Sequence, residues 1–288
     1  MTVAALLLVA GAAVLHAGWN ALAKRAGDPV LFLWWAGAVA TALYTPIALA
    51  TLARQGLRAA ALPFVVGTVI LHAVYFFALG RAYAAGDYSV VYPIARGLGV
   101  ALVPIGALLL FDERLSALGT LGIALVAGGI LGLRAGLPRS PGAAVGAARP
   151  RAGTGWAAAT GVLIAGYSLL DHAGVARLSP LAYIWLMQLG SCLLLAPVAL
   201  ARRDALACEW RQNRSTIVAA AIMSPTAYLL VLFAFQLSKT GYVVAAREMS
   251  IALSTIIGAA WMNERIGRRR LAGAAVVLAG VICVALAR

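Results

Sequence analysis

The sequence contains a second copy of itself at a shift of 151 residues, the difference between Glu264 and Glu113. At this shift, residue types that seldom coincide by chance fall on one another without a gap. The coinciding pairs include Pro29 with Pro180, Trp34 with Trp185, Pro46 with Pro197, Arg96 with Arg247, Gly122 with Gly273 and Gly129 with Gly280. An internal repeat of this kind determines the domain organisation. We expect two homologous halves, residues 1–134 and 153–288, joined by a Pro-, Gly- and Arg-rich linker at 135–152.

The composition indicates a membrane protein. Of the 288 residues, 63% are hydrophobic and only 11% are charged, and the mean hydropathy is +0.94. A soluble protein needs more polar surface than this chain can supply. The formal net charge of +14 would suggest nucleic acid as a partner of a soluble domain. Here the basic residues lie between apolar runs, so we expect the lipid bilayer as partner and no nucleic acid.

Ten apolar segments are long enough to cross a bilayer, which takes about 20 residues. They are 3–23, 30–52, 61–82, 88–110, 117–134, 154–174, 180–200, 215–237, 240–261 and 268–287. Five spans per half is an odd number, so the second half enters the membrane from the opposite side. The predicted fold class is an all-α polytopic membrane protein with ten transmembrane helices in two inverted-topology five-helix repeats around a central cavity.

Basic residues are distributed unequally between the two membrane faces. The face that holds the N-terminus, called side one here, carries six Lys and Arg residues, and side two carries fifteen. The excess of positive charge on the cytoplasmic face then predicts that side two is cytoplasmic and both termini are outside.

Polar residues within spans are costly, which makes each one a candidate for function. His16, Trp19 and Asn20 lie on the first span, and the shift of 151 places Tyr167 on His16 and Asp171 on Asn20. We expect these residues to form facing walls of a substrate cavity. The alternative is a set of interhelical hydrogen bonds that only hold the helices together, at about 0.6 kcal/mol each.

Arg96 and Arg247 lie well inside their spans, whereas the other Lys and Arg residues lie at span ends or between spans, and the two coincide in the repeat. Two such residues facing a cavity would bind a carboxylate or phosphate, because guanidinium offers forked donors. The sequence leaves two alternatives open. The arginines would otherwise neutralise Asp171 and Glu248, or extend their side chains to the interface. Glu248 follows Arg247 directly, and neighbouring residues point in different directions on a helix.

His72, Tyr75 and Tyr92 add an aromatic group that suits an amphipathic solute, with simple packing as the alternative. His72 is a candidate for proton coupling, and Asp171 and Glu248 are its rivals. Gly128, Gly132 and Gly136 form a GxxxGxxxG face that predicts close helix packing or a subunit contact. Both a monomer and a homodimer remain open.

Motifs for other chemistry are missing from the sequence. Its three cysteines, Cys192, Cys208 and Cys283, lack metal-ligand spacing. No Walker loop and no hydrolase set occurs either. We therefore expect no metal, no cofactor, no catalytic residues and no enzyme activity.

Two stretches, LLLFDERLSALGTLGIALVAGGI and AAWMNERIGRRRLAGAAVVLAGVIC, resemble the repeated EamA module of the drug/metabolite transporter superfamily. The resembling residues are Glu113, Arg114, Leu115, Gly122 and Gly129, and then Glu264, Arg265, Ile266, Gly273 and Gly280. HAGWNALAK at 16–24 resembles the first span of one branch of that family. The resemblance implies a ten-helix basket that moves amino acids, metabolites or drugs by alternating access, often as an exporter in the bacterial inner membrane. It also implies cytoplasmic termini, in conflict with the charge distribution, so orientation and direction stay open.

The residues and the resemblance together predict a secondary transporter of a small polar or amphipathic metabolite. The alternative is a membrane-embedded enzyme or accessory subunit acting on lipid-linked substrates. Such enzymes place carboxylates or histidines in interfacial loops, whereas the short loops of this chain are mostly basic.

Overall fold

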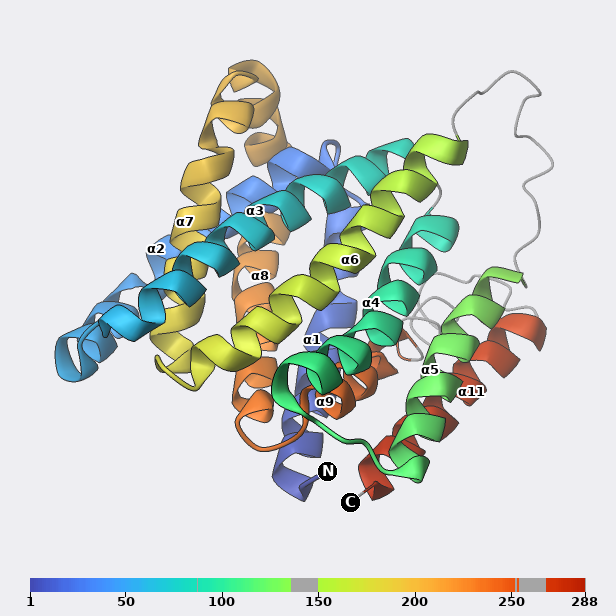
Figure 1. The fold of residues 1–288 in the computed structure, drawn as a ribbon. Coiled ribbons are helices and arrows are strands. Elements are labelled where there is room, and N and C mark those ends of the chain that lie inside the picture. The colour runs from blue at the N-terminus through green and yellow to red at the C-terminus, as the bar shows by residue number, and fades with distance from the viewer. Residues whose placement is uncertain (87, 136–149, 252, 254–267, 288) are drawn as a thin grey trace.

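The computed structural model describes residues 1–86, 88–135, 150–251, 253 and 268–287. Helices account for nearly all of them, with no strand in these ranges (Figure 1). In chain order they are α1 Val3–Lys24, α2 Pro29–Gln55, the 3-10 turn η1 Ala59–Ala61, α3 Leu62–Ala85, α4 Tyr88–Phe111, α5 Ala117–Ala135, α6 Pro150–Val175, α7 Pro180–Leu200, α8 Arg203–Phe235, α9 Thr240–Arg247 and α11 Arg268–Leu286. Six helices in the described ranges are long and apolar enough to cross a membrane. The chain is thus an all-α polytopic membrane protein.

Turn and capping residues set the helix ends. The Asp28 carboxylate accepts hydrogen bonds from the amides of Val30 and Leu31 at 3.0 and 3.2 Å. Pro29 stands at the start of α2, where a missing N–H costs nothing. Gly56 ends α2 with a φ of 71°, a conformation that favours glycine. These residues lie between the expected spans 3–23, 30–52 and 61–82.

Helix packing follows the repeat register. The shift of 151 relates α1 to α6, α2 to α7 and α3 to α8. Correspondingly, α3 packs on α6 as α1 packs on α8, and α2 packs on α7. At the α2–α7 contact, Trp34 Nε1 donates to the carbonyl of Cys192 at 3.0 Å, and Trp185 Nε1 donates to the carbonyl of Thr41 at 3.3 Å. The shift exchanges these two bonds. The division at 134 and 153 stays a prediction.

Glycines let α5 and α11 approach closely. A Cβ on Gly122 would lie 2.7 Å from the carbonyl oxygen of Gly280, and one on Gly129 would lie 3.0 Å from that of Gly273. The close helix packing predicted for Gly128 and Gly132 is thus made by Gly122 and Gly129, on another face of α5, and the alternative of a subunit contact stays a prediction. Gly128 has nothing within 4 Å of its Cβ position. The same is true of Gly132, and Gly136 lies outside the described residues.

Several helix boundaries differ from the predicted spans. α8 begins at Arg203 rather than 215, because the segment expected as a loop is helical up to a kink at Asn213. α6 begins at Pro150, inside the predicted linker, since proline suits a first helical turn. The expected span 240–261 starts as α9, which ends at Arg247. Its residues 254–261 lie outside the described ranges.

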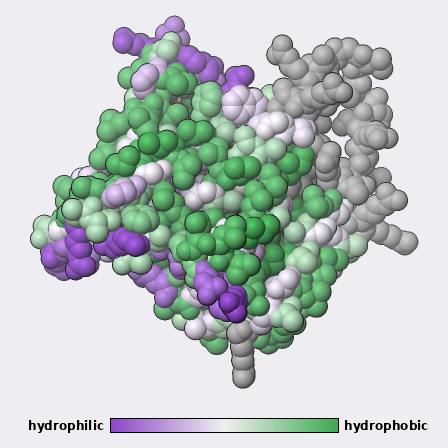
Figure 2. Space-filling model, in the orientation of Figure 1, coloured by the Kyte–Doolittle hydropathy of each residue, from purple (hydrophilic) through white to green (hydrophobic). Residues whose placement is uncertain are grey.

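The molecular surface has the pattern of a membrane protein. Figure 2 shows a broad hydrophobic band between hydrophilic residues gathered at opposite ends of the molecule. Large apolar side chains point outward in this fold, among them Leu7, Ile105 and Leu109, which is 78% exposed. A bilayer would cover them, since about 30 Å of hydrocarbon surrounds such helices.

Candidate functional site

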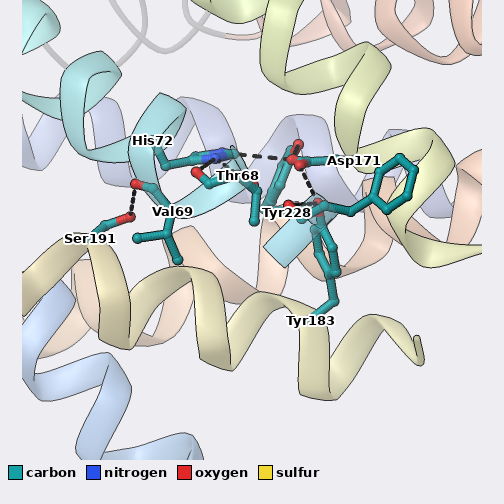
Figure 3. A network of polar contacts seen from close by, with 8 residues as sticks. Thr68, Val69, His72, Asp171, Tyr183, Ser191 and Tyr228 are labelled. Carbon is teal, nitrogen blue, oxygen red and sulfur yellow. Dashed lines mark hydrogen bonds and ion pairs between the residues drawn. The ribbon is translucent and has the colours of Figure 1, made fainter. Parts of the chain in front are cut away.

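Asp171 is the centre of a buried polar network inside the helix bundle (Figure 3). The carboxylate is fully buried. It accepts a hydrogen bond from the Tyr183 hydroxyl at 2.8 Å and another from the Tyr228 hydroxyl at 2.5 Å. His72 Nε2 lies 3.9 Å from Asp171 Oδ2. Three helices, α6, α7 and α8, thus join at one carboxylate, and α3 supplies the histidine. Such a carboxylate is satisfied by its own protein neighbours.

His72 is held in place by its own helix and by aromatic rings. Its Nδ1 lies 3.0 Å from Thr68 Oγ1 and 3.1 Å from the Thr68 carbonyl. The ring centroid is 4.3 Å from that of Tyr167 and 6.0 Å from that of Tyr75. His72 therefore connects the Asp171 network to the aromatic group that the sequence predicts.

His16 offers an unpaired hydrogen-bond donor. Trp19 Nε1, which can only donate, lies 3.0 Å from His16 Nδ1. Nδ1 must accept that bond, so in the neutral imidazole the proton is on Nε2. Nε2 is buried and has no hydrogen-bond partner among the described residues. Asn20 donates to the His16 carbonyl and accepts from the Tyr83 hydroxyl, so it packs helices together.

The two intramembrane arginines have different surroundings. Arg96 Nε donates to Glu248 Oε2 at 2.9 Å across the two halves of the chain. Arg247 lies 3.8 Å from Glu248 Oε1, although the two residues are adjacent in sequence. Its Nε and Nη2 atoms are buried without a hydrogen-bond partner in the described part of the structure. Glu248 thus binds Arg96 more closely than Arg247, and the anion clamp of two arginines stays a prediction.

A narrow cavity of about 30 Å³ lies between α1, α3, α6, α7 and α8. Its walls include six of the predicted and network residues, His16, Trp19, His72, Tyr75, Tyr167 and Tyr228. Arg247 does not line it. Small organic ligands occupy about 300–1,000 Å³. The cavity therefore has to widen before such a solute can enter.

Five of the eleven sequence-predicted site residues line this cavity, and the sequence reasoning missed some polar residues around it. The side chain of Tyr92 lies outside the described residues. Thr68, Tyr183 and Gln188 were not predicted, although all three are polar groups in or at the ends of apolar segments. For Gln188 a further signal exists, because the repeat places it on Gly37. Gln188 Nε2 lies 3.4 Å from the Cβ position of that glycine.

In the first half of the chain, Glu113 of the Glu-Arg-Leu tripeptide has a structural role. Glu113 accepts hydrogen bonds from the Thr240 amide at 2.9 Å and from the Thr240 hydroxyl at 2.9 Å. A carboxylate at the start of a helix satisfies free N–H groups and the helix dipole. Glu113 thereby fastens α9 to the α4–α5 connection. Glu264 and Arg265 lie outside the described residues.

The fold of this chain is similar to that of a solved structure. One solved structure, described only as the crystal structure of a protein, matches with a TM-score of 0.70 at 16% sequence identity. The match covers 98% of this chain and 97% of the other. At that identity it shows a shared fold. No protein with a curated function matches the chain significantly.

The fold and the comparison with family models define a membrane transporter. Residues 151–286 match the EamA-like transporter family, and residues 33–126 match the Small Multidrug Resistance protein family. These matches confirm the resemblance to the EamA module of the drug/metabolite transporter superfamily, and the EamA-like match covers 136 of the 288 residues. Both families consist of transporters of small solutes or drugs, so the enzyme alternative is wrong.

Proposed function

We propose that this chain is a secondary transporter that moves a small organic solute with an anionic group across the bacterial inner membrane by alternating access. Two inverted five-helix repeats, 1–134 and 153–288, would form the two moving halves. The exchange of Trp34 and Trp185 contacts under the repeat shift supports such an arrangement.

Buried hydrogen-bond donors without an acceptor support the choice of an anionic solute. Three buried donor atoms have no hydrogen-bond acceptor among the described residues: His16 Nε2 at the cavity, and Arg247 Nε and Nη2, although Arg247 Nε lies 3.8 Å from Glu248 Oε1. His16 is 6% exposed and Arg247 is 1% exposed. A buried donor left unpaired costs about 1–3 kcal/mol, and more if charged. A carboxylate or phosphonate would satisfy several of these donors together.

The carboxylates argue against a cation as the principal substrate group. Asp171 already accepts two tyrosine hydroxyls, and Glu248 already binds Arg96. An ammonium would therefore have to share carboxylates that already accept hydrogen bonds, whereas an anion would meet donors without a hydrogen-bond partner. An amino-acid-like solute remains compatible, with its carboxylate at Arg247 and its apolar part against Trp19 and Tyr75.

A thermal-shift screen of the purified protein tests this assignment. The ligands are short carboxylates, phosphonates, amino acids and amines. A ligand at 100 times its Kd stabilises by about 2.7 kcal/mol. We expect stabilisation by anions and its loss in Arg247→Gln, with Arg114→Gln as the exposed control. If only amines stabilise, and Asp171→Asn removes that effect, the anion assignment is wrong.

We further propose that transport is coupled to protons through His72 and Asp171. His72 Nε2 lies 3.9 Å from Asp171 Oδ2, so a proton needs to move only a short distance between them. In vesicles, flux driven by a pH gradient should disappear in His72→Gln and Asp171→Asn while exchange of substrate for substrate persists. Retained pH-driven flux in both variants would contradict the coupling.

A further inference from the structure

A basic pocket opens at side one, away from the central cavity. It has a volume of about 400 Å³, within the range of small-molecule sites. The connection after α2 contributes Arg54 and Arg58, the α6–α7 turn contributes Arg177 and Ser179, and the end of α8 contributes Gln236. Figure 2 shows hydrophilic residues at the lower left, where Figure 1 places the α2–α3 and α6–α7 connections.

The side chains of this pocket are donors for an anion. Among the described residues that line it, the formally charged ones are three arginines. Arg177 is held by a 2.6 Å bond from Nη1 to the Ala173 carbonyl, and its guanidinium lies 4.4 Å from the Phe64 ring centroid. Ser179 Oγ is buried without a hydrogen-bond partner in the described part of the chain. Forked guanidinium donors beside a hydroxyl suit phosphate.

The repeat supplies an internal precedent for an anion at this place. The shift of 151 relates Arg58 to Glu209 and Ser179 to Asp28. On side two, Glu209 is 4% exposed, and its Oε2 accepts from the Asp28 amide at 2.9 Å. A carboxylate of the chain therefore lies at the N-terminus of α2. At the corresponding N-terminus of α7 the chain provides an arginine instead, and the Ser179 side chain makes no cap.

We propose that the side-one pocket is a binding site for a phosphate group, supplied by an anionic lipid headgroup or by a soluble phosphate compound. The phosphate takes the position that the Glu209 carboxylate occupies on side two. Arg54, Arg58 and Arg177 surround it, and Ser179 donates from the turn. This site shares no lining residue with the central cavity, so it does not depend on the transported solute.

Two binding measurements on the purified full-length protein distinguish the two sources. The lipid measurement uses native mass spectrometry with phosphatidylglycerol, and phosphatidylcholine serves as reference lipid. The second measurement is calorimetric titration with inorganic phosphate. Arg58→Gln removes one exposed guanidinium, and Arg58→Glu introduces the residue type of its repeat counterpart. Arg114→Gln is the matched control, because Arg114 is exposed on the same side but lies outside the pocket.

We expect Arg58→Gln to weaken binding about tenfold, the effect of one hydrogen bond to a charged group. Arg58→Glu should abolish binding, because its own carboxylate fills the position. Loss of phosphatidylglycerol binding alone assigns a lipid site, and loss of phosphate binding alone assigns a soluble ligand. The proposal is overturned if neither ligand binds, if the Arg58 variants bind as wild type, or if Arg114→Gln loses as much binding.

Discussion

Replacing Glu248 by Gln is expected to destabilise the protein more than replacing Arg96 by Met. Both side chains are buried, at 1% and 7% exposure, and their charged atoms are 2.9 Å apart. Glu248 also lies 3.8 Å from Arg247. Among the described residues Glu248 contacts both guanidinium groups, so its loss affects both arginines, whereas the loss of Arg96 leaves Glu248 with Arg247.

The size of the effect follows from the cost of breaking a buried ion pair, about 3–5 kcal/mol. We expect Glu248→Gln near the upper limit and Arg96→Met near the lower limit. The double variant should be more stable than the sum of the two changes predicts, by about 1–3 kcal/mol, because the residues are in contact. The exposed pair of Arg114 and Asp112, 3.4 Å apart, provides the control. Arg114→Gln should cost about 1 kcal/mol or less.

Reversible unfolding of the purified variants in mixed micelles, titrated with a denaturing detergent, measures these differences. The reasoning is refuted if Arg96→Met is as destabilising as Glu248→Gln. It is also refuted if Glu248→Gln unfolds at the same detergent fraction as Arg114→Gln, because the carboxylate would then not be shared.

Two further sets of variants test the helix packing and the buried network. Gly129→Ala should cost about 1–3 kcal/mol of unfolding free energy, because its Cβ would meet backbone atoms of α11. Gly128→Ala should stabilise by up to about 1 kcal/mol, and equal melting temperatures would contradict the α5–α11 contact. Tyr183→Phe and Tyr228→Phe should each cost about 1–3 kcal/mol, because each leaves a buried oxygen of Asp171 without its donor. In an Asp171→Asn background both costs should shrink, and unchanged costs would show that the hydroxyls act elsewhere.

Much of the fold could be predicted from local signals in the sequence. Asp28 and Pro29 set the start of α2, and the apolar runs gave most helices within a few residues. The repeat register could also predict contacts between halves, as the Trp34 and Trp185 bonds illustrate. The start of α8 could not be predicted, because a helix that extends beyond the membrane carries the polar residues expected of a loop.

The pairing within the site depends on three-dimensional position. Arg96 and Arg247 are equivalent in the sequence, but Glu248 falls on Gly97, so only one half supplies an acid. The adjacency of Glu248 to Arg247 in the sequence did not predict that Glu248 binds Arg96 more closely. Likewise, the glycine spacing on α5 did not distinguish the face toward α11 from the outward face, because both carry glycines.

Substrate exchange in proteoliposomes tests the central claim most directly. Vesicles containing the protein are loaded with the anion that gives the largest thermal shift, and entry of the same labelled anion is followed. We predict saturable exchange in wild type and Arg114→Gln, and its loss in Arg247→Gln with the protein still folded. Undiminished exchange in Arg247→Gln would contradict the proposal that this buried arginine holds the solute.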